Sequence, residues 1–124
     1  MNLFLEICEI LLELLDIQGQ EIKPETYLIR DLGAESIDLL ELSVAINNTF
    51  KINVIDDDIF LIKLRDIIFE SKGKVITKVD YLSLKFPFLT KTRINEILDD
   101  LENGPVLQVK DLLAYIEWKK QNAS

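Results

Sequence analysis

The fold is decided by residues 31–42, which read DLGAESIDLLEL. Gly33 permits backbone angles that are closed to other residues, so the first part of this stretch is predicted to be a tight loop. Ser36 is of a residue type that helix starts favour. Apolar side chains then recur at helical spacing as far as Phe50, with acidic side chains between them. The pattern predicts a loop that delivers one serine to an amphipathic helix running from about Ser36 to Lys51.

Two interpretations of Ser36 stay open from these residues alone. Serine is a common N-cap, and a leucine and a glycine a few residues before a serine make only a short pattern. However, the residue three positions after Ser36 is Leu39, so Ser36 has no partner for a reciprocal capping box. The serine is therefore either a structural cap or a group that carries chemistry.

The composition is that of one acidic domain. The chain has 124 residues, of which 48% are hydrophobic, and this suits a single packed core. Its net charge of −8 argues against nucleic acid as the main partner. The charge is uneven, because residues 1–62 carry a net charge of −10 and residues 63–124 carry +2. The serine lies in the acidic half.

Several kinds of chemistry and location are disfavoured. The chain has no histidine, which is the commonest general base and metal ligand. Cys8 is the only cysteine, so an internal disulfide is excluded and a reducing, cytoplasmic location is expected. The first residues predict a core helix rather than a signal peptide, and no apolar run is long enough to span a membrane. The run Asp56–Asp58 lacks the alternating spacing of a calcium loop, so no metal site is predicted.

Helices are predicted on both sides of the serine. Residues 2–17 repeat apolar side chains at helical intervals, and Gly19 should end that helix. A long loop over residues 18–35 follows. Residues 107–116 carry another apolar stripe and predict a last helix. The whole chain therefore predicts an all-α fold.

The middle of the chain predicts further helices. The third helix should begin at the three aspartates and continue through residues 59–70. Stop and start signals then alternate, and they predict two more helical segments. In chain order these signals are Ser71-Lys72-Gly73, Thr77 with Asp80, Pro87, Thr90 or Thr92, and Asn103-Gly104-Pro105.

Residues 32–38, which read LGAESID, resemble the attachment site of acyl carrier proteins. That family has an aspartate where this chain has Glu35 and a leucine where it has Ile37, so both differences keep charge or apolarity. The resemblance implies a four-helix bundle in which Ser36 bears a 4'-phosphopantetheine arm, with an acyl chain held on the arm as a thioester.

The resemblance covers residues 1–62 and 106–121, and the chain departs from the family between them. Residues 64–105, called the insert below, are expected to add helices between the third and the last family helix. The expected organisation is thus a single carrier domain over residues 1–124, interrupted by the insert at about residues 64–105.

The resemblance also implies a function in which partners do the catalysis. It implies a monomeric carrier in fatty acid, lipid or polyketide biosynthesis, and not an enzyme. Its partners would be a phosphopantetheinyl transferase and acyl-handling enzymes whose basic patches meet an acidic face. The side chains that match this face are Glu35, Asp38, Glu41 and Asp56. Asn47 and Asn48 stand where many carriers have acids, which favours a specialised carrier, and an ordinary solvated helix face remains the alternative.

The insert is basic and apolar at once. Residues 63–93 hold 8 basic and 3 acidic side chains, a net charge of +5. Such a segment suits a membrane surface, an acidic partner or the chain's own acidic half. We expect its apolar side chains to pack against the second and third helices and to enlarge or cover the family's acyl pocket. These side chains are Leu82, Leu84, Phe86 and Phe88.

Three alternatives to this picture remain. The insert could be a stabilising subdomain without a part in cargo handling. The chain could be an unmodified helical interaction module that lost the arm. It could also be a surface-binding protein that acts through the basic insert.

Overall fold

The structure is a computed structural model, and it describes residues 2–122. In this part of the chain every regular element is a helix and there is no strand, so the predicted all-α class is confirmed. Its elements are α1 (Leu3–Leu14), α2 (Ser36–Phe50), α3 (Asp56–Ile59), α4 (Leu64–Ser71), α5 (Lys78–Lys85), α6 (Lys91–Asp100), the 3-10 helix η1 (Leu101–Asn103) and α7 (Val109–Gln121).

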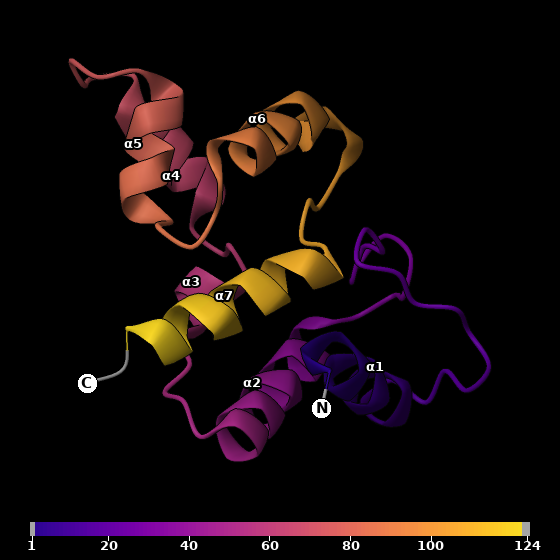
Figure 1. Cartoon of the computed structure of the whole chain (residues 1–124). Coiled ribbons are helices and arrows are strands. Elements are labelled where there is room, and N and C mark those ends of the chain that lie inside the picture. Colours follow the sequence, from indigo (N-terminus) through magenta and orange to yellow (C-terminus); the bar gives the residue numbers. More distant parts are fainter. Residues whose placement is uncertain (1, 123–124) are drawn as a thin grey trace.

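Helix α7 runs between two groups of helices (Figure 1). On one side lie α1 and α2, which pack on each other, and on the other side lie α4, α5 and α6 of the insert. Tyr115 of α7 is fully buried and touches both parts. Its ring lies 5.1 Å from the ring of Phe88 in the insert, and its hydroxyl accepts a hydrogen bond of 3.1 Å from the backbone N–H of Ile55. The core is therefore continuous across α7.

The third helix is shorter than predicted, because α3 ends at Ile59 and α4 begins only at Leu64. The prediction of one helix through residues 59–70 was wrong. Ile59, Phe60 and Leu61 are consecutive and all buried, whereas one helix buries only a stripe of its surface. The chain instead turns at Leu61, whose φ of 56° is left-handed, and this turn lets all three side chains reach the core.

The packing of the insert also corrects an expectation. Leu82 is buried on α5 and Phe86 is buried at its C-cap, α5 packs against α4 and α6, and Phe88 packs on α7. Leu84 is 71% exposed. Residues two apart on a helix point to nearly opposite sides, so Leu84 could not share a face with Leu82 and Phe86. The expectation that these four side chains pack on α2 and α3 was therefore wrong.

The predicted start and stop signals of the insert are confirmed. The Thr77 hydroxyl caps α5 by accepting a hydrogen bond of 3.1 Å from the N–H of Asp80. Thr90, and not Thr92, caps α6 in the same way through the N–H of Arg93, at 3.0 Å. No helix among residues 2–122 is long and apolar enough to cross a membrane.

Candidate functional site

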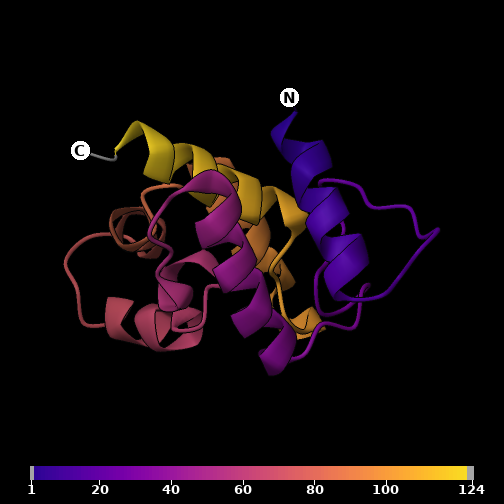
Figure 2. The ribbon, with the colours of Figure 1, turned by 90° about the horizontal axis from the view of Figure 1, so that it is seen from below.

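The long loop between α1 and α2 swings away from the body and returns to the start of α2 (Figure 2). Its last part is a compact turn. The N–H of Gly33 donates to the carbonyl of Ile29 at 3.1 Å, and the N–H of Ala34 donates to that of Leu28 at 3.0 Å. Gly33 has a φ of 71°, which explains the glycine at this position. Since Leu28 and Ala34 are buried, this turn fixes where α2 begins.

The loop is also fastened to the start of α7. The first N–H groups of a helix lack partners inside the helix. Here the N–H groups of Val109 and Lys110 donate to the loop carbonyls of Thr26 and Pro24, at 3.0 and 2.8 Å. The loop that leads to the serine is thereby held by the last helix of the chain.

Ser36 is the first residue of α2, and the N-cap is its neighbour Glu35. The carboxylate of Asp38 accepts a hydrogen bond of 2.8 Å from the backbone N–H of Glu35, as in a capping box. The helix start is thus capped without the serine. Ser36 is exposed, and its hydroxyl takes part in none of the hydrogen bonds found among residues 2–122. Ser36 is therefore not the cap of α2.

The four carboxylates predicted to meet partners differ in their surroundings. Glu35 and Glu41 are exposed, and Glu41 lies on the outer face of α2. Asp38 is half-buried and holds the helix start, as described above. Asp56 is half-buried and accepts a hydrogen bond of 2.6 Å from the hydroxyl of Ser43, which ties α3 to α2. Glu41 thus faces solvent freely, Glu35 is exposed but also takes part in the capping box of α2, and Asp38 and Asp56 have local structural partners.

An exposed apolar stripe accompanies these acids, and its exposure was not predicted from the helical spacing of its residues. Ile37, Leu40 and Val44 are 56%, 56% and 58% exposed. The signal was present, because α2 carries two apolar stripes at helical spacing and only one of them can face the core. The inward stripe is the one that contains Leu42 and Ile46, which are buried. The outer face of α2 therefore combines apolar side chains with Glu41.

A cavity of about 420 Å³ lies beside the first turn of α2. Leu39 lines it one turn after Ser36, and Ile29 lines it from the loop. The other walls come from the α3–α4 connection, from both ends of the insert and from the two residues that follow it. These lining residues are Phe60, Leu61, Ile62, Leu64, Arg65, Asp66, Leu101, Gly104, Pro105, Val106 and Leu107. The insert does border a cavity, but through its ends and not through Leu82–Phe88.

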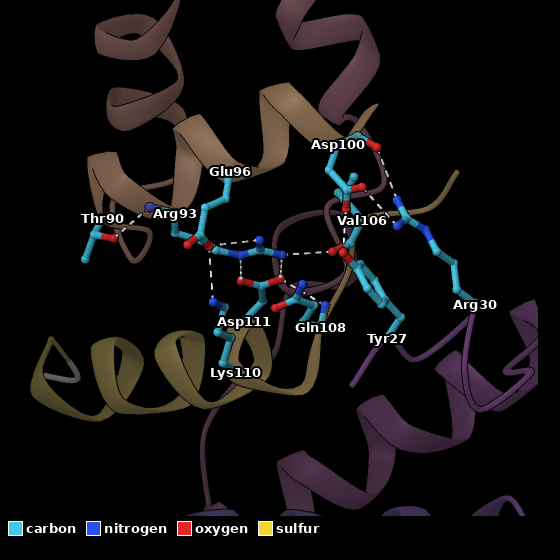
Figure 3. Close-up of polar contacts among 10 residues, drawn as sticks. All are labelled: Tyr27, Arg30, Thr90, Arg93, Glu96, Asp100, Val106, Gln108, Lys110 and Asp111. Carbon is cyan, nitrogen blue, oxygen red and sulfur yellow. Dashed lines mark hydrogen bonds and ion pairs between the residues drawn. The ribbon is translucent and has the colours of Figure 1, made fainter. Parts of the chain in front are cut away.

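Asp100 at the end of α6 ties the insert to the loop (Figure 3). Its carboxylate accepts hydrogen bonds from the Tyr27 hydroxyl at 2.6 Å and from Arg30 Nη1 at 3.1 Å. Arg30 Nη2 also donates to the carbonyl of Gly104 at 2.9 Å. The hydrogen bonds from Arg30, Tyr27 and Asn103 hold the pKa of Asp100 well below its usual range.

A second polar cluster fastens the insert to α7 (Figure 3). The guanidinium of Arg93 meets the carboxylate of Asp111 in two hydrogen bonds, Nε to Oδ1 at 2.7 Å and Nη2 to Oδ2 at 2.8 Å. Both side chains are buried, and Asp111 also accepts from the backbone N–H of Gln108 at 2.9 Å. Arg93 donates further to the carbonyl of Val106. These bonds join the start of α6 to the start of α7.

The site suits a phosphodiester-linked arm better than catalysis by the chain itself. The Ser36 hydroxyl is exposed and uncommitted, and a helix start presents N–H groups that favour a phosphate. The cavity beside it is lined mainly by apolar side chains that could shelter an acyl chain. The Glu35 carboxylate would repel a phosphate, so we assign it no part in holding one. The residues present fit a 4'-phosphopantetheine group on Ser36.

Comparisons with known proteins agree with this chemistry. The model of the phosphopantetheine attachment site family matches residues 6–65. An acyl carrier protein of Nitratidesulfovibrio vulgaris (strain DSM 19637 / Miyazaki F) is 39% identical over 70 residues, which cover 56% of this chain and 92% of that protein. An acyl carrier protein of Syntrophus aciditrophicus (strain SB) is 36% identical over 78 residues, or 62% of this chain and 98% of that protein. No solved structure gives a significant match. The chain belongs to the acyl carrier protein family.

Proposed function

We propose that this chain is modified on Ser36 and carries acyl groups as thioesters for partner enzymes of fatty acid, lipid or polyketide biosynthesis. As a member of its family it is a carrier and not an enzyme, and its prosthetic group is 4'-phosphopantetheine. The observation that carries the assignment to Ser36 is its free, exposed hydroxyl at a helix start that other residues cap.

The chain's own residues would position and shelter the cargo. The arm, when attached, supplies the thiol that bears the acyl group. Leu39 lines the cavity one turn beyond Ser36, so a chain folding back from the arm meets apolar side chains within one turn of its attachment point. Ile62 is half-exposed at this cavity and offers a further apolar contact.

Partner enzymes would meet the outer face of α2. Glu35 and Glu41 supply the exposed charge, and the apolar stripe of α2 supplies the area that a partner can bury. Asp38 and Asp56 would add negative charge near this face without direct contacts to a partner, because their carboxylates already accept hydrogen bonds within the chain. Asn48 is exposed and leaves the far end of the face uncharged, which supports a specialised set of partners. Asn47 is half-buried instead, and its Oδ1 accepts a hydrogen bond of 2.7 Å from the N–H of Val54.

We also propose that residues 1–124 form one carrier domain with the insert at about residues 64–105. The family model ends at residue 65, where the insert begins. The continuity of the core across α7 supports one domain rather than two.

The test is the intact mass of the chain after incubation with coenzyme A and a phosphopantetheinyl transferase of broad specificity. The wild type should gain one phosphopantetheine, and Ser36→Ala should gain none while keeping its helical circular dichroism. Ser83→Ala is the control, since Ser83 is a serine on α5, away from the start of α2, and it should be modified like the wild type. An unmodified wild type would favour the interaction module instead.

A further inference from the structure

The connection between α4 and α5 projects from the rest of the molecule (Figures 1 and 2). We call residues 69–78 the tip. Three apolar side chains are exposed on it, namely Phe69, Val75 and Ile76, and Val75 is fully so. Leu84 is also exposed, toward the other end of α5. These side chains line neither the cavity beside α2 nor a smaller one between α6 and α7, so neither cavity gives a reason for their being apolar.

Lysines surround these apolar side chains. Residues 71–79 contain Lys72, Lys74 and Lys78 and no acidic residue. None of these three lysines forms an ion pair within the described part of the chain. Lys72 Nζ lies 5.4 Å from the centre of the Phe69 ring, so charge and apolar surface are in contact.

Two acids lie here, Glu70 inside the tip and Asp80 just beyond it, and both are already engaged. The carboxylate of Asp80 pairs with Lys91 at 3.0 Å, and Glu70 accepts a hydrogen bond of 3.0 Å from the hydroxyl of Tyr81. The pairing with Lys91 and the bond from Thr77 hold the pKa of Asp80 below its usual value, so this acid stays ionised and paired. The tip therefore presents a positive surface on a chain whose net charge is negative.

We propose that the tip docks on an anionic lipid bilayer, with its lysines against lipid phosphates and Val75 and Ile76 in the interface. Lysines around exposed apolar side chains match the two forces that hold peripheral proteins on membranes, which are headgroup attraction and shallow apolar burial. A bilayer fits better than an acidic protein, because the apolar side chains stand on a projecting tip and not in a groove. A soft surface can take in such side chains one by one.

The charge of the whole chain orients this contact. Outside residues 63–93 the chain carries a net charge of −13, so an anionic surface repels that part of the chain as a whole. Helix α2, with Ser36 at its start, lies on the other side of α7 from the tip (Figure 1). Docking would thus leave Ser36 and the outer face of α2 open to other enzymes. The contact does not require modification of Ser36.

The test is flotation of the unmodified full chain with vesicles of phosphatidylcholine and phosphatidylglycerol in equal parts, with pure phosphatidylcholine vesicles beside them. The chain should float with the mixed vesicles only, and less at high salt, because exposed charges are screened. Val75→Ser should weaken binding about tenfold through lost apolar burial. Lys72→Gln and Lys74→Gln should each weaken it roughly fivefold.

Matched controls are Leu5→Ser, an equally simple loss of an exposed apolar side chain on α1, and Lys23→Gln in the first loop. Both should float like the wild type. All these side chains are exposed, so circular dichroism should show the same helix content throughout. A wild type that stays unbound, that binds both kinds of vesicle equally, or that is weakened as much by the controls as by the tip variants would overturn the proposal.

Discussion

At the scale of single residues, the buried pair of Arg93 and Asp111 is the contact most sensitive to change. Two hydrogen bonds of 2.7 and 2.8 Å join them, and each partner is also bonded to backbone, Arg93 to Val106 and Asp111 to Gln108. A buried pair of this kind adds less to stability than its geometry suggests, because both charges leave water. Removing one partner, however, strands the other charge in the core.

Arg93→Met should therefore lower the free energy of unfolding by about 3–5 kcal/mol, measured by urea denaturation. Lys110→Met is the matched control, because the ion pair of Lys110 with Glu96 is partly exposed, and it should cost about 1 kcal/mol or less. The double variant Arg93→Met with Asp111→Asn removes the stranded charge and should be more stable than Arg93→Met alone. Equal losses for Arg93→Met and Lys110→Met would contradict this account.

At the scale of elements, the acidic residues of α2 have two different roles, one in the stability of the helix and one in the contact with partners. Asp38 holds the helix start, whereas Glu41 is exposed beside the apolar stripe of the outer face. An N-cap interaction contributes about 1 kcal/mol to stability. An exposed carboxylate contributes little to stability, but it can steer a basic partner toward the face. Charge reversal at the two positions should therefore act on different measurements.

Glu41→Lys should leave the free energy of unfolding within about 0.5 kcal/mol of the wild type and should slow modification by the transferase. Asp38→Lys should also slow modification, and in addition it should lower the free energy of unfolding by about 1 kcal/mol, because the N–H of Glu35 loses its acceptor. The measurements are urea denaturation and the initial rate of mass increase at low and high salt. Unchanged modification rates for Glu41→Lys would mean that the outer face of α2 is only a solvated surface.

The elements that could be predicted from sequence are those set by local patterns. The start of α2, the caps at Thr77 and Thr90 and the stop at Pro87 follow from the nearest few residues. The break at Leu61 could not be predicted, because it depends on burial against segments far away in the sequence. The capping box of α2 was not predicted, because its N-cap is Glu35 and glutamate is not among the residue types that N-caps favour.

The candidate site shows the same division. The exposed serine and the charges near it follow from residues 31–42, but the cavity walls come from four separate segments. Asp100 contacts Tyr27 and Arg30, which lie 73 and 70 positions before it in the sequence. Nothing in the local sequence of either partner indicates the other. Long-range contacts of this kind fix the position of the insert relative to the rest of the chain.

At the scale of the whole molecule, the insert is joined to the rest of the chain at two places, α7 and the loop between α1 and α2. Phe88 and Arg93 bind it to α7, and Asp100 binds it to the loop that positions Ser36. A change at Asp100 should therefore be felt at the start of α2, although Asp100 does not line the cavity. The charge of Asp100 also makes this link depend on pH.

The sign of that dependence follows from the lowered pKa of Asp100. In the unfolded chain its carboxylate titrates near the ordinary value of 3.8, whereas in the folded chain Arg30 and Tyr27 keep it ionised to lower pH. The stabilisation is therefore fully present above that ordinary value, and it is lost as the pH falls from there toward the lowered folded value.

Asp100→Asn should cost about 1–3 kcal/mol at neutral pH, because hydrogen bonds to a charged acceptor are stronger than those to a neutral one. The difference in free energy of unfolding between wild type and variant should shrink between about pH 5 and pH 2. Amide hydrogen exchange should quicken at Gly33 and Ala34, since the loop loses its tie to the insert. Asp99→Asn, a change at the exposed neighbouring aspartate, is the control and should alter neither measurement. If Asp100→Asn lowered stability equally at all these pH values, the loss would come from packing and not from the charge that links the insert to the attachment loop.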